Sequence, residues 1–194
     1  MSATNETPVQ VQIEATPNPN SHRFAVNRKV LEGPGRDFPH RGAALGSPLP
    51  EELFKMPGVA GVFVGPDFVT VTMQEGSAWG NVKGLIRELV ADFVERGEAP
   101  VGAPPPEMKP GAHSAEAATE LDKRIVEVLD REIRPAVAMD GGDIVFAGFD
   151  NGVVMLKLKG SCNGCPSSMM TLRMGIESRL KAQFPEVESV QAVP

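Results

Sequence analysis

A proline-rich stretch near the middle of the sequence sets the strongest limit on how this chain folds. Residues 97–113 contain five prolines and almost no large apolar side chains. Such a stretch cannot build a core and is expected to run as an extended, semi-stiff spacer. We therefore expect two compact domains, residues 1–96 and 114–194, joined by a Pro/Gly-rich linker at 97–113. The chain has 194 residues, so each domain is long enough to bury a core of its own.

Hydrophobic periodicity predicts an α+β domain before the spacer. Val9, Val11 and Ile13 alternate with polar residues, which predicts a half-buried strand. A second strand through Phe24 and Val26 is expected to pair with it. The remaining expected elements are a short helix at 47–54, a hairpin at 61–73 and an amphipathic helix at 82–93. Together they predict a small sandwich of one sheet and its helices.

The region after the spacer predicts a second α/β sandwich in the order helix, strand, strand, helix, strand. Its first helix is expected to stop near Arg134, because Pro135 follows and the residue before a proline is disfavoured in a helix. Asp150-Asn151-Gly152 predicts a tight hairpin turn. The expected elements are a helix at 121–134, strands at 144–149 and 153–158, a helix at 166–184 and a strand at 187–193.

The two cysteines of the chain, Cys162 and Cys165, share a short loop between a predicted strand and a predicted helix. Two thiolates at this spacing can chelate one metal, form a reversible disulfide, or supply half of a four-thiolate site. The N-terminus of the following helix is expected to favour thiolates and so to lower the pKa of both thiols. The spacing alone leaves all three uses open.

Chain length and the number of donors bear on that choice. Only 29 residues follow Cys165, too few for the remaining strands and loop of a thioredoxin-like redox fold. Structural zinc and most iron-sulfur clusters want four donors, and no histidine lies near the cysteine pair. A symmetric dimer would supply four thiolates at its two-fold interface. The alternatives are a zinc-bridged dimer, a thiol-disulfide oxidoreductase with Cys162 as its exposed nucleophile, and a pure interaction module.

Composition and missing motifs count against several other function classes. The formal net charge is −6, so no overall positive field exists to hold nucleic acid or an anionic membrane. No apolar run approaches the roughly 20 residues that span a bilayer. No phosphate-binding loop, Gly-x-Ser-x-Gly or His-Glu-x-x-His motif occurs, so hydrolase and nucleotide-dependent functions have no support. We expect a protein that binds and passes on a metal cluster and is not an enzyme. The first ten residues lack the features of a secretory or transit signal, from which we expect a cytoplasmic location.

Two further groups of residues are given structural interpretations. Asp140 and Asp143 resemble a pair of ligands for a hard metal, but the two glycines between them predict a turn instead. Five methionines of the second domain could shield a metal site from water, yet methionine at helical spacing is more often gap-filling core, which we expect here. These are Met139, Met155, Met169, Met170 and Met174.

Several motifs of this chain occur together in a known family. Those after the spacer are Arg134-Pro135, Met139-Asp140-Gly141-Gly142-Asp143, Leu156-Lys157-Leu158-Lys159-Gly160-Ser161-Cys162-Asn163-Gly164-Cys165-Pro166-Ser167-Ser168, Thr171-Leu172 and Gly175-Ile176-Glu177. Those before it are Thr16-Pro17-Asn18-Pro19-Asn20, Ser47-Pro48-Leu49, Leu53-Phe54, Gly58-Val59 and the segment 62–71. In this combination the chain resembles the NifU-like (Nfu-type) iron-sulfur cluster scaffold and carrier family over both domains.

The resemblance implies a function in iron-sulfur cluster assembly. It implies a 4Fe-4S cluster that bridges a homodimer, with Cys162 and Cys165 of each subunit as ligands. Four thiolates serve a 2Fe-2S cluster equally well, so the residues themselves leave the cluster type open. The expected partners are apo iron-sulfur client proteins and upstream assembly proteins. Small departures from the family pattern, such as Asn163-Gly164 between the cysteines, remove no ligand.

Overall fold

The computed structural model describes residues 8–102, 119–162 and 166–193, of which residues 166–169 are described by their backbone alone. Contacts within the chain form two units, the first made mostly of residues up to Gly102 and the second mostly of residues from Thr119 onward. Each unit combines one sheet with helices, which confirms the predicted α+β class. Most of the predicted linker, residues 103–113, lies outside the described residues.

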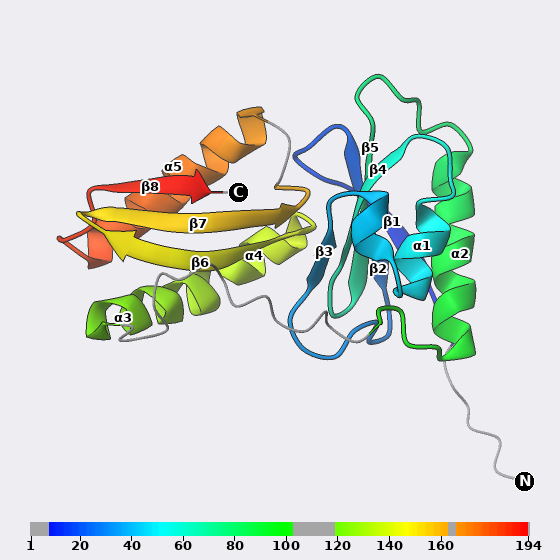
Figure 1. Ribbon diagram of the computed structural model, residues 1–194, viewed down its shortest axis with the longest axis horizontal. Helices are drawn as coiled ribbons and strands as arrows, with labels where there is room; N and C mark the ends of the chain where they lie inside the picture. Colours follow the sequence, from blue (N-terminus) through cyan, green and yellow to red (C-terminus); the bar gives the residue numbers. More distant parts are fainter. Residues whose placement is uncertain (1–7, 103–118, 163–165, 194) are drawn as a thin grey trace, which may run out of the picture. The chain divides into compact units, whose positions relative to one another are not determined.

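The first unit is built on a five-stranded antiparallel sheet (Figure 1). Its strands lie in the order β1-β2-β5-β4-β3, and the predicted pairing of the first two strands is confirmed by the register of Ile13 opposite Phe24. The elements are β1 (Val11–Ala15), β2 (Ser21–Val26), β3 (Arg36–Phe38), the 3-10 helix η1 (Arg41–Ala44), α1 (Pro48–Leu53), β4 (Val59–Val64), β5 (Phe68–Met73) and α2 (Val82–Arg96).

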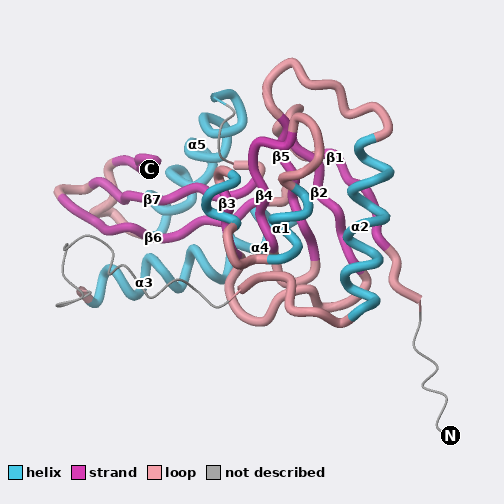
Figure 2. Tube along the Cα trace, turned by 45° about the vertical axis from the view of Figure 1, so that its right-hand side comes forward, coloured by secondary structure: helices cyan, strands magenta, loops and turns pink. Residues whose placement is uncertain are grey.

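The core of this unit lies between the sheet and its helices, with α2 in contact with β1 and β2 (Figure 2). Phe24 of β2, Leu53 of α1 and Ile86 of α2 are fully buried there. Strand β3 was not expected, because its neighbourhood is rich in glycine and proline. Phe38 nevertheless buries its ring, which anchors this strand at the edge of the sheet.

The second unit carries a three-stranded sheet in the order β6-β7-β8. Strands β6 and β7 are antiparallel, and β8 lies parallel to β7. Asn151 and Gly152 both have positive φ, the conformation of a two-residue type I′ turn, which confirms the predicted hairpin. The elements are α3 (Glu120–Val128), the π-helical segment η2 (Leu129–Ile133), α4 (Arg134–Met139), β6 (Gly142–Asp150), β7 (Val153–Gly160), α5 (Pro166–Gln183) and β8 (Ser189–Val193).

The helices of the second unit bury their apolar faces against this sheet. Ile125 of α3 and Leu180 of α5 are fully buried in one core with Val154 and Leu156 of β7. None of the helices among the described residues is long and apolar enough to cross a membrane.

The prediction that the first helix of this unit stops near Arg134 is wrong. Helical backbone continues past Pro135 to Met139, with a π-helical turn at residues 129–133 directly before it. Proline lacks an N–H group and its ring clashes with the carbonyl four residues earlier. The wider π turn changes the hydrogen-bond register, so that Pro135 falls in the first turn of α4, where a proline is tolerated.

Truncation of the Phe24 ring should destabilise the first unit selectively. Phe24 is fully buried, so Phe24→Ala leaves a cavity and should lower the free energy of unfolding by about 3–5 kcal/mol. Trp79 is the single tryptophan of the chain and packs against the same core, so its fluorescence during urea unfolding reports this unit. Leu85→Ala, at a side chain 53% exposed, is the control and should change stability by less than about 1 kcal/mol. Equal effects of the two changes would contradict the described core.

Candidate metal centre

Cys162 lies where the sequence predicts it, between a strand and a helix. Strand β7 ends at Gly160 in a left-handed conformation, Ser161 and Cys162 follow, and α5 begins at Pro166. Its partner Cys165 lies outside the described residues, together with Asn163 and Gly164. Cys162 and the residues that contact it form the described part of the site.

The turn between α4 and β6 forms a support for Cys162. The N–H group of Ser161 donates a hydrogen bond of 3.2 Å to the carbonyl of Gly141, and the Ser161 hydroxyl donates to the carbonyl of Asp140. A Cβ atom at Gly142 would lie 2.4 Å from the Cys162 Sγ, closer than any real contact. The glycine is therefore needed to make room for the sulfur, a role that the sequence interpretation as a simple turn did not include.

Arg134, the first residue of α4, holds this turn in place. Arg134 Nε lies 3.1 Å from Asp143 Oδ1, and its Nη2 donates a 2.9 Å hydrogen bond to the carbonyl of Ile144. The same Asp143 oxygen accepts the Ile144 N–H at 2.8 Å. Because the Asp143 carboxylate is engaged within the fold, these contacts favour the structural interpretation of Asp143 over that of a metal ligand.

The prediction of a lowered thiol pKa is wrong for Cys162. The residue is only 7% exposed and belongs to the hydrophobic core of the second unit. Burial raises the pKa of the Cys162 thiol to about 11, and the nearby carboxylates of Asp140 and Asp143 act in the same direction, against the hydrogen bond with Ser161. The position of Cys162 before a helix predicted a lowered thiol pKa. The packing of Cys162 against Gly142 could not be predicted from the local sequence.

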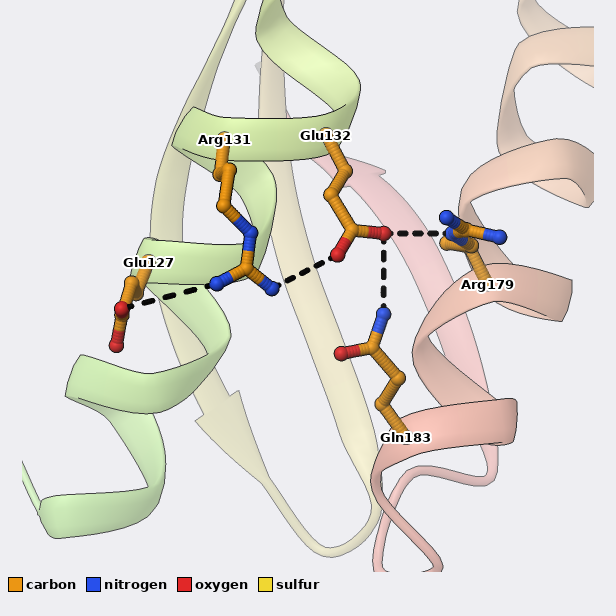
Figure 3. Close-up of polar contacts among 5 residues, drawn as sticks. All are labelled: Glu127, Arg131, Glu132, Arg179 and Gln183. Carbon is orange, nitrogen blue, oxygen red and sulfur yellow. Dashed lines mark hydrogen bonds and ion pairs between the residues drawn. The ribbon is translucent and has the colours of Figure 1, made fainter.

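A polar cluster centred on Glu132 connects the π-helical segment η2 to helix α5 (Figure 3). Glu132, on the π-helical segment η2, accepts hydrogen bonds from Arg131 at 2.8 Å, from Arg179 at 2.7 Å and from Gln183 at 3.1 Å. The contacts with Arg131 and Arg179 lower the pKa of the Glu132 carboxyl. Arg179 and Gln183 belong to α5, so the cluster fixes η2 against that helix. No sequence signal pointed to it.

The predicted gap-filling role is wrong for three of the five methionines. The side chains of Met139, Met170 and Met174 are 75%, 66% and 63% exposed. Met155 is half-buried on β7, and the side chain of Met169 lies outside the described part of the chain. Helical spacing alone did not show which face of each helix meets the core.

Together, the fold and the sequence define a class: a two-domain α+β protein with a Cys-x-x-Cys motif in its second domain. Two family models match the chain. Residues 11–97 match the model described as scaffold protein Nfu/NifU N terminal, and residues 125–191 match the model of the NifU-like domain.

Similar proteins cover nearly the whole chain. A human protein named NFU1 iron-sulfur cluster scaffold homolog, mitochondrial, is 44% identical over 188 residues, which are 94% of this chain and 71% of that protein. A Drosophila simulans protein of the same name is 43% identical over 186 residues, again 94% of this chain but 64% of its own length. The chain thus spans less than two thirds of the fly relative. It belongs to the Nfu family of iron-sulfur cluster scaffold proteins.

Among solved structures, a solution NMR structure of a NifU-like protein from Saccharomyces cerevisiae is similar. The TM-score is 0.45 at 21% sequence identity, and the match covers 52% of this chain and 92% of the yeast chain.

The names of the relatives contradict the expected cytoplasmic location. The human and fly proteins are both named mitochondrial, which points to that compartment instead. The expectation rested on the composition of the first ten residues, and that composition does not identify a compartment.

A methyl group at Gly142 should disturb the support of Cys162. In Gly142→Ala the new Cβ meets the Cys162 sulfur and lies 3.0 Å from the carbonyl of Lys159, so either the thiol or the β6–β7 pairing must shift. We expect a loss of about 1–3 kcal/mol in unfolding free energy and a lower cluster content after reconstitution, measured by urea unfolding and by iron analysis.

The matched control is Gly175→Ala on α5, where a Cβ meets nothing within 4 Å. This change should leave the cluster content unchanged and stabilise the helix by roughly 0.5–1 kcal/mol. Equal behaviour of the two variants would contradict the role given to Gly142.

Proposed function

We propose that this chain carries a 4Fe-4S cluster between two copies of itself and transfers it to apo iron-sulfur proteins. Cys162 and Cys165 of each copy are the four ligands. The protein acts as a carrier and catalyses no reaction of its own. The choice of a 4Fe-4S over a 2Fe-2S cluster follows the family resemblance, because four thiolates serve both.

The shortage of donors within one chain is the observation that carries this proposal. The described residues contain no group of three or more histidine, cysteine, aspartate or glutamate side chains that could hold a metal ion. The whole sequence has two cysteines and three histidines, of which His22 and His40 belong to the first unit. With two cysteines, one chain supplies two of the four thiolates that ligate an iron-sulfur cluster.

A second copy supplies the missing ligands most simply. A two-fold axis sets the same loop of both copies face to face, so two pairs of thiolates converge without any further ligand. A cluster held only at such an interface is released when the copies separate. That property suits a carrier better than an electron-transfer protein, which keeps its cluster.

The burial of Cys162 speaks against the redox alternative. A catalytic cysteine of an oxidoreductase is partly exposed and has a lowered pKa. The Cys162 thiol is 7% exposed and packs in the core, so it does not fit the role of an exposed nucleophile. An apolar surrounding is compatible with a metal ligand, since it limits the access of water to the bound metal.

Loss of either thiol should abolish cluster binding. We expect Cys162→Ala and Cys165→Ser, after anaerobic reconstitution, to lack the absorbance near 400 nm that iron-sulfur clusters give. Alanine is chosen at position 162 because an unpaired hydroxyl in this buried place would cost about 1–3 kcal/mol. Far-UV circular dichroism of the apo-proteins checks that both variants fold.

The control for these variants is Lys181→Ala, an exposed change on α5 that should keep the full cluster. A full cluster in either cysteine variant would rule out the shared four-thiolate site. A colourless wild-type dimer that contains zinc would favour the zinc-bridged alternative.

Transfer should proceed directly between proteins. When the loaded dimer is mixed with an apo-ferredoxin of the 4Fe-4S class in the presence of a strong iron chelator, we expect the ferredoxin spectrum to appear with little loss to the chelator. The rate should rise with the concentration of both proteins, because the cluster passes within a complex. Complete capture of the iron by the chelator would show release into solution instead.

A further inference from the structure

The helices of the second unit leave one face of its three-stranded sheet uncovered. Buried side chains of α3, η2, α4 and α5 form a single core with Val154 and Leu156 of β7 and Val190 of β8. Successive residues of a strand point to opposite faces of a sheet, so Lys157 and Lys159 of β7 point away from this core. Figure 1 shows the sheet from its uncovered side, with α5 passing behind β8.

The strand register brings lysines and apolar side chains together on the uncovered face. Lys157 lies opposite Val145 of β6 and Val193 of β8, and Met155 and Lys159 lie two residues before and after it on β7. Lys157 is exposed, and the other four residues are half-buried. We refer to these five residues as the lysine face.

The positive charge of the lysine face is not balanced by neighbouring carboxylates. Strands β7 and β8 contain no aspartate and no glutamate. Asp143 lies opposite Lys159 in the register, but its carboxylate is engaged by Arg134 Nε at 3.1 Å. Among the described residues, neither Lys157 nor Lys159 has an ion pair or a side-chain hydrogen bond.

The other lysines of the second unit are paired within their own helices. Lys123 lies 3.6 Å from Glu120 on α3, and Lys181 lies 2.6 Å from Glu177 on α5. The carboxylates of the helices thus neutralise the lysines on the covered side of the sheet. On the lysine face the two charges stay available for a partner from outside the unit.

An acidic protein surface is the occupant that best fits the lysine face. Val145, Met155 and Val193 offer apolar contact area, and the two lysines beside them attract carboxylates. The formal net charge of the chain is −6, so a polyanion as large as a nucleic acid is repelled by the rest of the molecule. At about 0.1 M salt, charges more than about 10 Å apart are largely screened, so the local lysines dominate the contact with a partner seated on them.

We propose that the lysine face is the surface on which acidic client proteins dock. The inference rests on the proposed function in one respect, namely that the docked partner is a client for the cluster. Docking holds the client on the chain and so raises its local concentration while the cluster is passed on. The uncovered face lies opposite the core in which Cys162 is buried, so a docked client leaves that core undisturbed.

Binding of an acidic apo-ferredoxin of the 4Fe-4S class tests this assignment without any cluster. Fluorescence anisotropy of the labelled ferredoxin measures its Kd for the cluster-free full chain at about 0.1 M salt. The double variant Lys157→Gln and Lys159→Gln should raise this Kd by about fivefold or more. Because charge carries the effect, the difference from the wild type should vanish at about 1 M salt.

Two matched double variants serve as controls. Lys123→Gln with Lys181→Gln removes the same net charge from the helices and should stay within about twofold of the wild type. Lys157→Arg with Lys159→Arg keeps the charge of the lysine face and should also bind as the wild type does.

A second measurement applies even if the glutamine variant does not fold. Wild-type chain labelled with ¹⁵N is titrated with the unlabelled apo-ferredoxin and followed by NMR. The amide shift changes of the second unit should be largest on β6, β7 and β8 and small on α3 and α5. Shift changes confined to the helices would contradict the proposal.

The outcomes separate this proposal from the proposed function. A wild-type chain that binds the ferredoxin through the lysine face but loads no cluster overturns the proposed function and leaves the docking surface standing. A wild-type chain that does not bind the ferredoxin, or a glutamine variant that binds it equally well, overturns the lysine face. Equal weakening in the helix control also overturns it, because net charge would then explain the effect. Binding of phosphatidylserine vesicles in place of the ferredoxin, lost in the glutamine variant, overturns it as well and assigns the face to a membrane surface.

Discussion

The close approach of Cys162 to Gly142 determines where the second unit holds Cys162. The end of β7 is fixed to the turn between α4 and β6, because the N–H group of Ser161 bonds to the carbonyl of Gly141 while the sulfur of Cys162 occupies the space that a side chain at position 142 would fill. The contacts of Arg134 with Asp143 and Ile144 hold this turn, and the hydrogen bonds of Glu132 with Arg179 and Gln183 hold η2 against α5.

The number of thiols limits what this loop can do on its own. One chain offers two cysteines, and the described residues add no further cluster of metal-binding side chains. In the proposed function a second copy supplies the other two thiolates. Sharing the site in this way couples the retention of a cluster to the association of two copies, which gives a carrier a physical means of release.

Local sequence signals predicted most helices, strands and turns. Contacts between residues far apart in the sequence were not predicted. Asn151-Gly152 identified its hairpin, because both residues favour the positive φ that the turn demands. The helix end predicted from Pro135 was wrong, because no local sequence signal indicates the π turn that accommodates this proline. The position of Cys162 was predicted, but its burial was not, because the glycine that packs on it lies 20 residues earlier. The contact between Glu132 and Arg179 joins residues 47 positions apart and could not be predicted from the sequence either.

The stoichiometry of the reconstituted protein tests the central claim most directly. After anaerobic reconstitution with iron and sulfide, native mass spectrometry and size exclusion would report the mass and metal content of each species together. The shared-site account predicts a brown dimer with about four irons and four sulfides for two chains, and no cluster on the monomer. A monomer that holds a complete cluster, or a colourless monomer that cycles a disulfide between Cys162 and Cys165, would contradict it.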